Sequence, residues 1–193
     1  MSKRVMIYKP FERFWHWSQM LLIVFMGLTG FEIHGTFTLF GFEQAVRWHN
    51  LASWALIILI AFAIFWHFVT GEWRQYVPKG EKVSVMIRYY TSGIFKNEPH
   101  PYKKTELSKL NPLQRLTYLG FKLLIVPVMV TTGLIMMFDE ELGLSFAGMA
   151  WWHTLGAFLL VTFFIVHVYM TTTGKTVFSN IKAMIVGWED LED

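Results

Sequence analysis

Cysteine is absent from the 193-residue sequence. Cysteine thiolates hold iron–sulfur clusters, close disulfides and attach c-type haem covalently, so this chain supplies none of these features and no thiolate zinc site. Charged residues are also scarce, at 16% of the chain, and the net charge is only +3. The basic residues flank apolar runs instead of gathering in one patch, a pattern that does not favour nucleic-acid binding.

Apolar residues are abundant: they make up 54% of the chain, aromatic residues make up 18%, and the mean hydropathy is +0.39. This composition indicates an integral membrane protein. Long apolar runs predict membrane-spanning helices, since about 20 residues cross the hydrocarbon core as one helix. The predicted spans are about 14–33, 45–70, 113–138 and 150–172. The expected fold is therefore an all-α, four-transmembrane-helix bundle that forms one domain over residues 1–193.

Lysine and arginine are concentrated in the N-terminal segment, in the loop 71–112 and after the fourth span. Positively charged flanks stay on the cytoplasmic side, so both termini and this loop are expected there. The stretch Asp139-Glu140-Glu141 has no basic residue beside it and is expected on the outer side. Short surface helices are expected from Val83 to Phe95 and from Val177 to Trp188, where they would contact lipid headgroups.

Two of the predicted spans carry a histidine near each end. His153 and His167 lie about 14 residues apart, which at about 100° and 1.5 Å per residue puts them on nearly one helix face, roughly 21 Å apart. His49 and His67 are about 18 residues apart and share a face in the same way. A single histidine on an apolar helix is more often a hydrogen-bonded core residue than a ligand. Two on one face, at two membrane depths, instead indicate functional positions.

The seven histidines fall into three groups by expected position. Near the cytoplasmic surface are His16, His67 and His167, and near the outer surface are His49 and His153. His34 and His100 lie in predicted loops and are expected to be ordinary surface or interface residues. Bis-imidazole ligation of haem needs opposing histidines at one depth on different helices. The outer pair is then His49 with His153. The inner pair is His167 with either His16 or His67, and helix geometry does not decide between them.

Small residues and one proline mark the first and third spans. Gly27 and Gly30 share a helix face with His16, which is consistent either with close helix packing or with room for a flat cofactor. The third span contains no histidine and is expected to act as a wall of the bundle. A kink is expected at Pro127, because proline frees a backbone carbonyl that neighbouring helices must satisfy.

Several stretches resemble the dihaem cytochrome b subunits of respiratory formate dehydrogenases, which have relatives in nickel–iron hydrogenases and thiosulfate reductases. They are RFWHW at 13–17, Thr29-Gly30, the histidine that opens the second span, LNPLQR at 110–115, TGLIMMF at 132–138 and the two-histidine fourth span. The resemblance covers almost the whole chain. It implies a subunit of a prokaryotic cytoplasmic (inner) membrane, with two haem b groups packed between its helices.

The resemblance also implies ligands residue by residue. By this correspondence His16 and His167 hold the inner haem iron, and His49 and His153 hold the outer haem iron. It thereby selects His16 at the inner end, where the geometry alone leaves His67 open.

A quinone site is a further implication of the resemblance, near Asn111 and Gln114 just before the third span. From the residues alone, Asn111 is a helix cap followed by Pro112 in the first turn, and Gln114 is a solvated side chain. The family often has glycine at the position of Pro112.

The expected function is that of an electron-transfer subunit. It would connect an outer-side iron–sulfur or multihaem cytochrome subunit with membrane menaquinone or ubiquinone, and anchor a respiratory oxidoreductase complex whose primary substrate chemistry belongs to another chain. Two other classes remain open: a haem-free membrane anchor, whose histidines only join helices, and a small proton or ion transporter that uses histidines as a relay. Both of these predict that the protein holds no haem.

Overall fold

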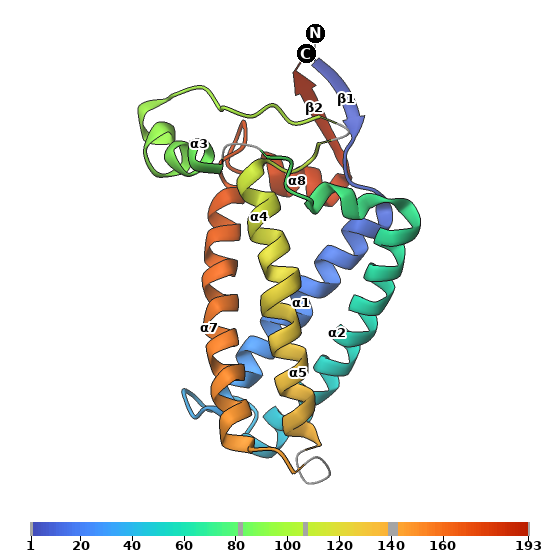
Figure 1. Ribbon diagram of the computed structural model, residues 1–193, viewed down its shortest axis with the longest axis vertical. Coiled ribbons are helices and arrows are strands. Elements are labelled where there is room, and N and C mark those ends of the chain that lie inside the picture. The colour runs from blue at the N-terminus through green and yellow to red at the C-terminus, as the bar shows by residue number, and fades with distance from the viewer. Residues whose placement is uncertain (1, 81–82, 106–107, 139–142, 193) are drawn as a thin grey trace. The chain divides into compact units, whose positions relative to one another are not determined.

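The computed structural model describes residues 2–80, 83–105, 108–138 and 143–192. Helices make up most of the chain, as the composition predicts (Figure 1). The chain forms two compact units, one of Tyr8–Glu72 and one of Met1–Ile7 with Trp73–Asp193. The expected acidic loop at Asp139-Glu140-Glu141 lies outside the described residues.

The unit Tyr8–Glu72 is a helical hairpin of α1 (Pro10–Ile33) and α2 (Phe42–Thr70). The backbone N–H of Lys9 donates to the Glu12 carboxylate at 2.7 Å, and Pro10 occupies the first turn, where its missing N–H has no helical partner to lose. The Lys9 ammonium also forms an ion pair with Glu72 at 2.8 Å. This pair joins the start of α1 to the end of the hairpin.

A buried carboxylate holds the loop between α1 and α2 by hydrogen bonds to its backbone. One oxygen of Glu32 accepts hydrogen bonds from the backbone N–H groups of Leu39, Phe40 and Gly41, each at 2.7 Å. Glu32 is only 5% exposed. Gly41 has φ of 86°, a conformation that glycine adopts without strain, immediately before α2 begins. The negative charge lies at the N-terminus of α2, where the helix dipole favours it.

In the other unit, α4 (Pro112–Gly120), a π-helical turn (Phe121–Ile125) and α5 (Val126–Met137) form one long helix. It runs beside α7 (Phe146–Thr171) (Figure 1). Pro127 has no N–H, so the carbonyl four residues before it loses its α-helical partner. The structure has a π turn that ends two residues before Pro127, and the kink expected at this residue stays a prediction.

Three helices are long and apolar enough to cross a membrane: α2, the continuous helix Pro112–Met137, and α7. The helix α1 covers the first predicted span but falls short of this hydropathy, because its first half carries His16, Ser18 and Gln19. Its apolar side chains Leu21 and Leu28 are nevertheless 64% and 45% exposed. The observed helices differ from the predicted spans by at most a few residues at each end.

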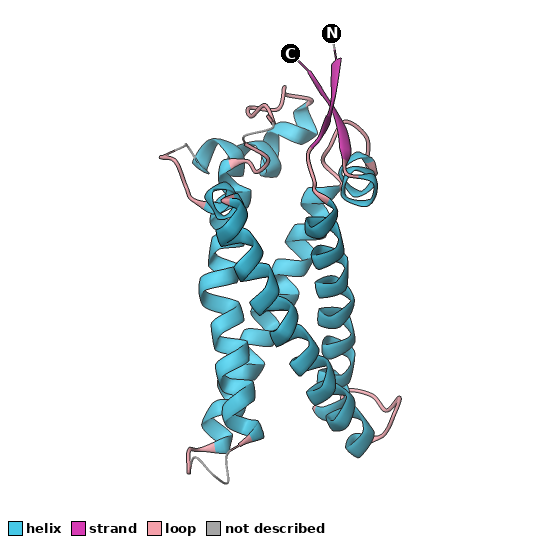
Figure 2. Cartoon of the chain, turned by 90° about the vertical axis from the view of Figure 1, so that its right-hand side faces the viewer, coloured by secondary structure: helices cyan, strands magenta, loops and turns pink. Residues whose placement is uncertain are grey.

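The remaining elements are short. The segment after α2 contains a 3-10 helix (Glu72–Tyr76), α3 (Val83–Arg88), a π turn (Tyr89–Gly93) and a 3-10 turn (Ile94–Lys96), which agrees with the expected surface helix. The other expected surface helix is α8 (Ser179–Val186). The purely helical expectation needs one correction: β1 (Ser2–Met6) pairs antiparallel with β2 (Trp188–Glu192) beside both chain ends (Figure 2). Its partners lie at opposite ends of the sequence, so no local pattern reveals the pairing.

Candidate functional site

In the α1–α2 hairpin, His49 on α2 is held by a threonine on α1. The Nδ1 atom of His49 lies 3.0 Å from the hydroxyl oxygen of Thr29. The same hydroxyl contacts the carbonyl oxygens of Phe25 at 3.0 Å and Met26 at 3.2 Å in its own helix. Thr29 is fully buried. A polar contact of this kind, made inside an apolar hairpin, fixes the orientation of the imidazole.

The same arrangement recurs in the other unit, where α5 and α7 pack side by side as a second helical hairpin. The Nδ1 atom of His153 on α7 lies 2.9 Å from the hydroxyl oxygen of Thr132 on α5. The hydroxyl of Thr132 contacts the Val128 carbonyl at 2.6 Å in its own helix, and Thr132 is 7% exposed. Each histidine follows its threonine along the chain by nearly the same interval, 20 residues in one hairpin and 21 in the other.

A glycine follows each threonine and lies against the same imidazole. A Cβ atom added at Gly30 would lie 3.4 Å from Cε1 of His49, and one added at Gly133 would lie 3.3 Å from Cε1 of His153. Both distances are tighter than usual van der Waals contact. Gly30 therefore serves close packing against His49, although its helix face is shared with His16. An added Cβ at Gly27 meets no described atom within 4 Å.

The hydrogen-bond geometry selects one tautomer of both histidines. A threonine hydroxyl has one proton, and in each hairpin it is directed to a backbone carbonyl of the same helix. The hydroxyl oxygen must then accept a hydrogen bond from the imidazole, so Nδ1 carries the proton. Nε2 consequently carries the lone pair, which is the electron pair that a metal ion binds.

At the other end of α7, His167 lies in an aromatic cluster. Its Nδ1 atom is 3.1 Å from the hydroxyl oxygen of Tyr118 on α4, and its ring stacks on Phe163 with centroids 5.8 Å apart. Phe163 in turn stacks on Phe121 at 4.6 Å. Among the described contacts, the hydrogen-bonding group beside His167 is thus a phenol, whereas those beside His49 and His153 are aliphatic hydroxyls.

Within the hairpin, His16 and His67 lie at the same end, as expected. The ring of His67 contacts Trp15 with centroids 5.3 Å apart, and His16 packs edge to face on Trp17 at 5.2 Å. His67 is 6% exposed, and its Nδ1 atom donates to the carbonyl of Ala63 in its own helix at 2.6 Å. This bond also leaves the lone pair on Nε2, so His67 stays a possible ligand beside His16.

Asn111 and Gln114 form a reciprocal helix cap at the start of α4. The N–H of Gln114 donates to Oδ1 of Asn111 at 2.9 Å, and the N–H of Asn111 donates to Oε1 of Gln114 at 3.0 Å. The helix-cap interpretation of Asn111 is therefore confirmed. Asn111 does more than cap: it is 4% exposed, and its Nδ2 group donates to the Tyr90 hydroxyl at 2.9 Å.

Tyr90 connects this cap with α7 and with an exposed histidine. The Tyr169 hydroxyl on α7 donates to the Tyr90 carbonyl at 2.9 Å, and the Tyr90 hydroxyl lies 3.3 Å from Nε2 of His100. Burial raises the pKa of the Tyr90 phenol. The His100 ring packs edge to face on Tyr89 at 4.8 Å, and this desolvation lowers its pKa despite its donation to the Tyr102 carbonyl. His100, expected as an ordinary loop residue, is thus linked to the start of α4.

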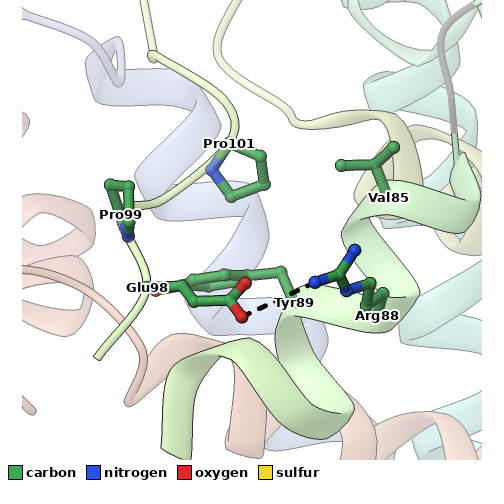
Figure 3. A pocket seen from close by; sticks show the side chains of 6 residues that line it. All are labelled: Val85, Arg88, Tyr89, Glu98, Pro99 and Pro101. Atoms are coloured by element: carbon green, nitrogen blue, oxygen red, sulfur yellow. Dashed lines mark ion pairs between the residues drawn. The ribbon is translucent and has the colours of Figure 1, made fainter. Parts of the chain in front are cut away.

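A surface pocket lies beside this cluster, between α3 and the segment on both sides of His100 (Figure 3). An ion pair between Arg88 and Glu98 at 3.7 Å crosses one side of it. The described lining residues are Val85, Arg88, Tyr89, Glu98, Pro99 and Pro101. Neither Asn111 nor Gln114 is among them, so this pocket is separate from the sequence-predicted quinone residues.

A family model described as prokaryotic cytochrome b561 matches residues 7–187. The chain belongs to this family. Cytochrome YdhU of Escherichia coli strain K12 is 28% identical over 198 residues, which cover 97% of this chain and 75% of YdhU. A protein of Azospira oryzae named as subunit YedZ1 of a protein-methionine-sulfoxide reductase is 26% identical over 191 residues, which cover 88% of this chain and 92% of YedZ1. The matches confirm a membrane b-type cytochrome without singling out the formate dehydrogenase subunits.

Membership of the prokaryotic cytochrome b561 family implies b-type haem, which is held by side-chain ligands and not by thioether bonds. The residues present fit this group. The chain has no cysteine, and Thr29 and Thr132 present His49 and His153 in the tautomer whose Nε2 can bind iron. The adjoining glycines bring helix backbone close to each imidazole ring, which restricts its rotation.

The sequence analysis gave Tyr118 and Tyr90 no role in the site, and it included Thr29-Gly30 and Thr132-Gly133 only in the stretches that carry a resemblance. One signal was available: a Thr-Gly pair occurs about 20 residues before each histidine that opens a span. Two antiparallel helices joined by a short loop place such positions side by side. No comparable sequence signal marks Tyr118 or Tyr90.

Proposed function

We propose that this chain is a dihaem b-type cytochrome that passes electrons between a redox partner on the outer side of the membrane and the quinone pool. When bound, the two haem b groups supply one-electron transfer. The observation that carries the proposal is the distribution of histidines in a b-type cytochrome chain. The α1–α2 hairpin has His16 and His67 near one end and His49 near the other, and α7 has one histidine near each end. Two ligand levels in each unit are what two haems require.

In this proposal His49 and His153 hold the outer haem iron, and His16 and His167 hold the inner haem iron. The identical hydrogen bonding of His49 and His153 supports the first pair. The second pair rests on the resemblance to formate dehydrogenase cytochromes, because His67 has suitable donor chemistry and lies at the same end of its hairpin as His16. The two units would form one domain, with α1 as the fourth span.

The quinone would react at the cytoplasmic side, near Asn111 and Gln114. Both side chains use their oxygen atoms in the helix cap, so the amide nitrogens are the groups that remain to donate to a quinone oxygen. Asn111 already directs its nitrogen to Tyr90, which brings the Tyr90 phenol into the same site. Either menaquinone or ubiquinone would suit these donors.

The partner would be an outer-side iron–sulfur or multihaem cytochrome subunit that performs the primary substrate chemistry. One observation supports a subunit role: the relative YedZ1 is named as a subunit of a reductase. The basic N-terminus and the loop 71–112 support an orientation with both termini in the cytoplasm of a prokaryotic cell. The chain would then anchor the complex in the cytoplasmic membrane.

Optical spectra of the purified protein test the proposal. We expect oxidised and dithionite-reduced spectra of b-type haem, two haems per chain by pyridine haemochrome assay, and complete extraction of haem by acidified acetone. His153→Ala should remove the outer haem and His167→Ala the inner one. A purified protein that binds no haem would instead support a membrane anchor or a proton or ion transporter. Loss of neither haem in these variants would refute the ligand assignment.

A further inference from the structure

The two hairpins hold their outer histidines by the same pair of residues, a threonine bonded to Nδ1 and a glycine packed against Cε1. The distances agree closely between the copies: 3.0 and 2.9 Å from the threonine oxygens to Nδ1, and 3.4 and 3.3 Å from the positions of glycine Cβ atoms to Cε1. Nothing in a helical hairpin requires a buried threonine beside a histidine. Its repetition in two units points to a role in the site and not in either hairpin alone.

The role follows from the direction of the hydrogen bonds. Each threonine hydroxyl donates a hydrogen bond to a backbone carbonyl, at 3.0 Å for Thr29 and 2.6 Å for Thr132. This bond polarises the hydroxyl and makes its oxygen a better acceptor. An acceptor for the Nδ1 proton raises the basicity of the imidazole as a metal ligand. A more basic ligand stabilises ferric iron relative to ferrous iron and therefore lowers the reduction potential.

The inner end differs in this respect. His167 faces the hydroxyl of Tyr118 at 3.1 Å. A phenol oxygen is a poorer acceptor than an aliphatic hydroxyl, because its lone pair is delocalised into the ring. The hydrogen bonding therefore makes the outer imidazoles stronger electron donors than His167.

We propose that Thr29 and Thr132 are positioning residues for the outer haem, which hold both of its imidazoles as Nδ1–H tautomers and keep its reduction potential low. This inference rests on the proposed function and extends it to residues that touch no cofactor. Gly30 and Gly133 assist by restricting the rotation of the same rings. An outer haem of low potential favours electron transfer toward the inner end of the protein.

The test uses full-length protein in detergent or in lipid and measures the midpoint potential of each haem by optical redox titration, together with the low-spin ferric EPR spectrum. Thr29→Val and Thr132→Val remove the hydroxyl and keep the β-branched shape, whereas Thr29→Ser and Thr132→Ser keep the hydroxyl. Thr162→Val is the matched control. This threonine also bonds a carbonyl of its own helix, Phe158 at 2.9 Å, but it is exposed.

Each valine variant should raise the midpoint potential of the outer haem, and the double variant should raise it further, because the two residues act on different ligands. The serine variants and Thr162→Val should keep the wild-type midpoint potential of the outer haem. The midpoint potential of the inner haem should stay at its wild-type value in every variant. If the valine variants lose the outer haem, the inference is still supported when the serine variants retain that haem. Loss of the outer haem in both the valine and the serine variants would overturn the inference. An outer potential unchanged in the double valine variant would overturn this inference alone. A wild-type protein without an outer haem would overturn the proposed function as well.

Discussion

Asn111 has two roles that substitutions can separate: it caps α4 and it donates to Tyr90. Asn111→Ala removes both. Loss of an N-cap side chain costs about 1 kcal/mol. Loss of a buried hydrogen bond costs about 1 kcal/mol net. The alanine variant should therefore destabilise the start of α4 by about 2 kcal/mol, the sum of the two. Asn111→Ser keeps an acceptor for the Gln114 N–H and loses only the contact with Tyr90, so it should cost about half as much.

Amide hydrogen exchange measures this local stability, because exchange at the start of a helix follows its opening free energy. A change of 1.4 kcal/mol corresponds to a tenfold change in an equilibrium constant. Peptides that contain Gln114 should then exchange about 30-fold faster in Asn111→Ala and about 5-fold faster in Asn111→Ser, each estimate following from the same relation. Equal exchange in the serine and alanine variants would refute the contribution of the cap. Wild-type exchange in Asn111→Ala would refute both contributions.

The same variants test the quinone assignment. Asn111→Ser keeps the helix start but removes the amide nitrogen, so quinone-linked oxidation of the reduced haems should slow while haem content stays at the wild-type level. Ser145→Ala is the matched control, because Ser145 caps α7 by accepting from the Gly148 N–H at 3.3 Å. It should alter local stability without altering quinone reaction. A serine variant with wild-type quinone kinetics would show that the Asn111 amide nitrogen takes no part in the quinone site.

Three further predictions concern other residues. Burial lowers the pKa of His100 from its ordinary value of 6.5, so the unfolded chain binds a proton more readily than the folded loop. The contribution of His100 to stability is therefore complete above about pH 6.5 and is lost as the pH falls toward the lower folded pKa. His100→Gln should remove this part of the pH dependence in thermal unfolding. His16→Ala should abolish the inner haem whereas His67→Ala should leave both haems, as optical spectra would show; the opposite result would assign the inner haem to His67. Reporters fused at either terminus should behave as cytoplasmic and one inserted near Glu141 as periplasmic, and the reverse pattern would exchange the inner and outer assignments.

The helices were predictable because their signals are local. Apolar runs locate the spans, and Pro112 after Asn111 marks the start of α4. The kink expected at Pro127 follows from the covalent structure of proline, whereas the π turn just before it was not specified by the sequence. The β1–β2 pairing and the Tyr90 contacts depend on segments that are distant in the sequence. No periodicity within a single segment encodes such contacts.

The outer and inner ends of the candidate site differ in how much the sequence indicates about them. The sequence predicts His49 and His153 as the outer pair because each opens a span, and this pairing stays a prediction. What the structure adds is that each histidine has the same threonine and glycine contacts within its own unit. The inner end has no such repetition: His167 meets Tyr118, His16 meets Trp17, and His67 bonds its own helix. Helix geometry therefore offered two inner candidates of equal depth, and the tautomer of His67 does not exclude it as a ligand. The inner and the outer ligand pairs both stay predictions, and the substitutions of His16, His67, His153 and His167 test them.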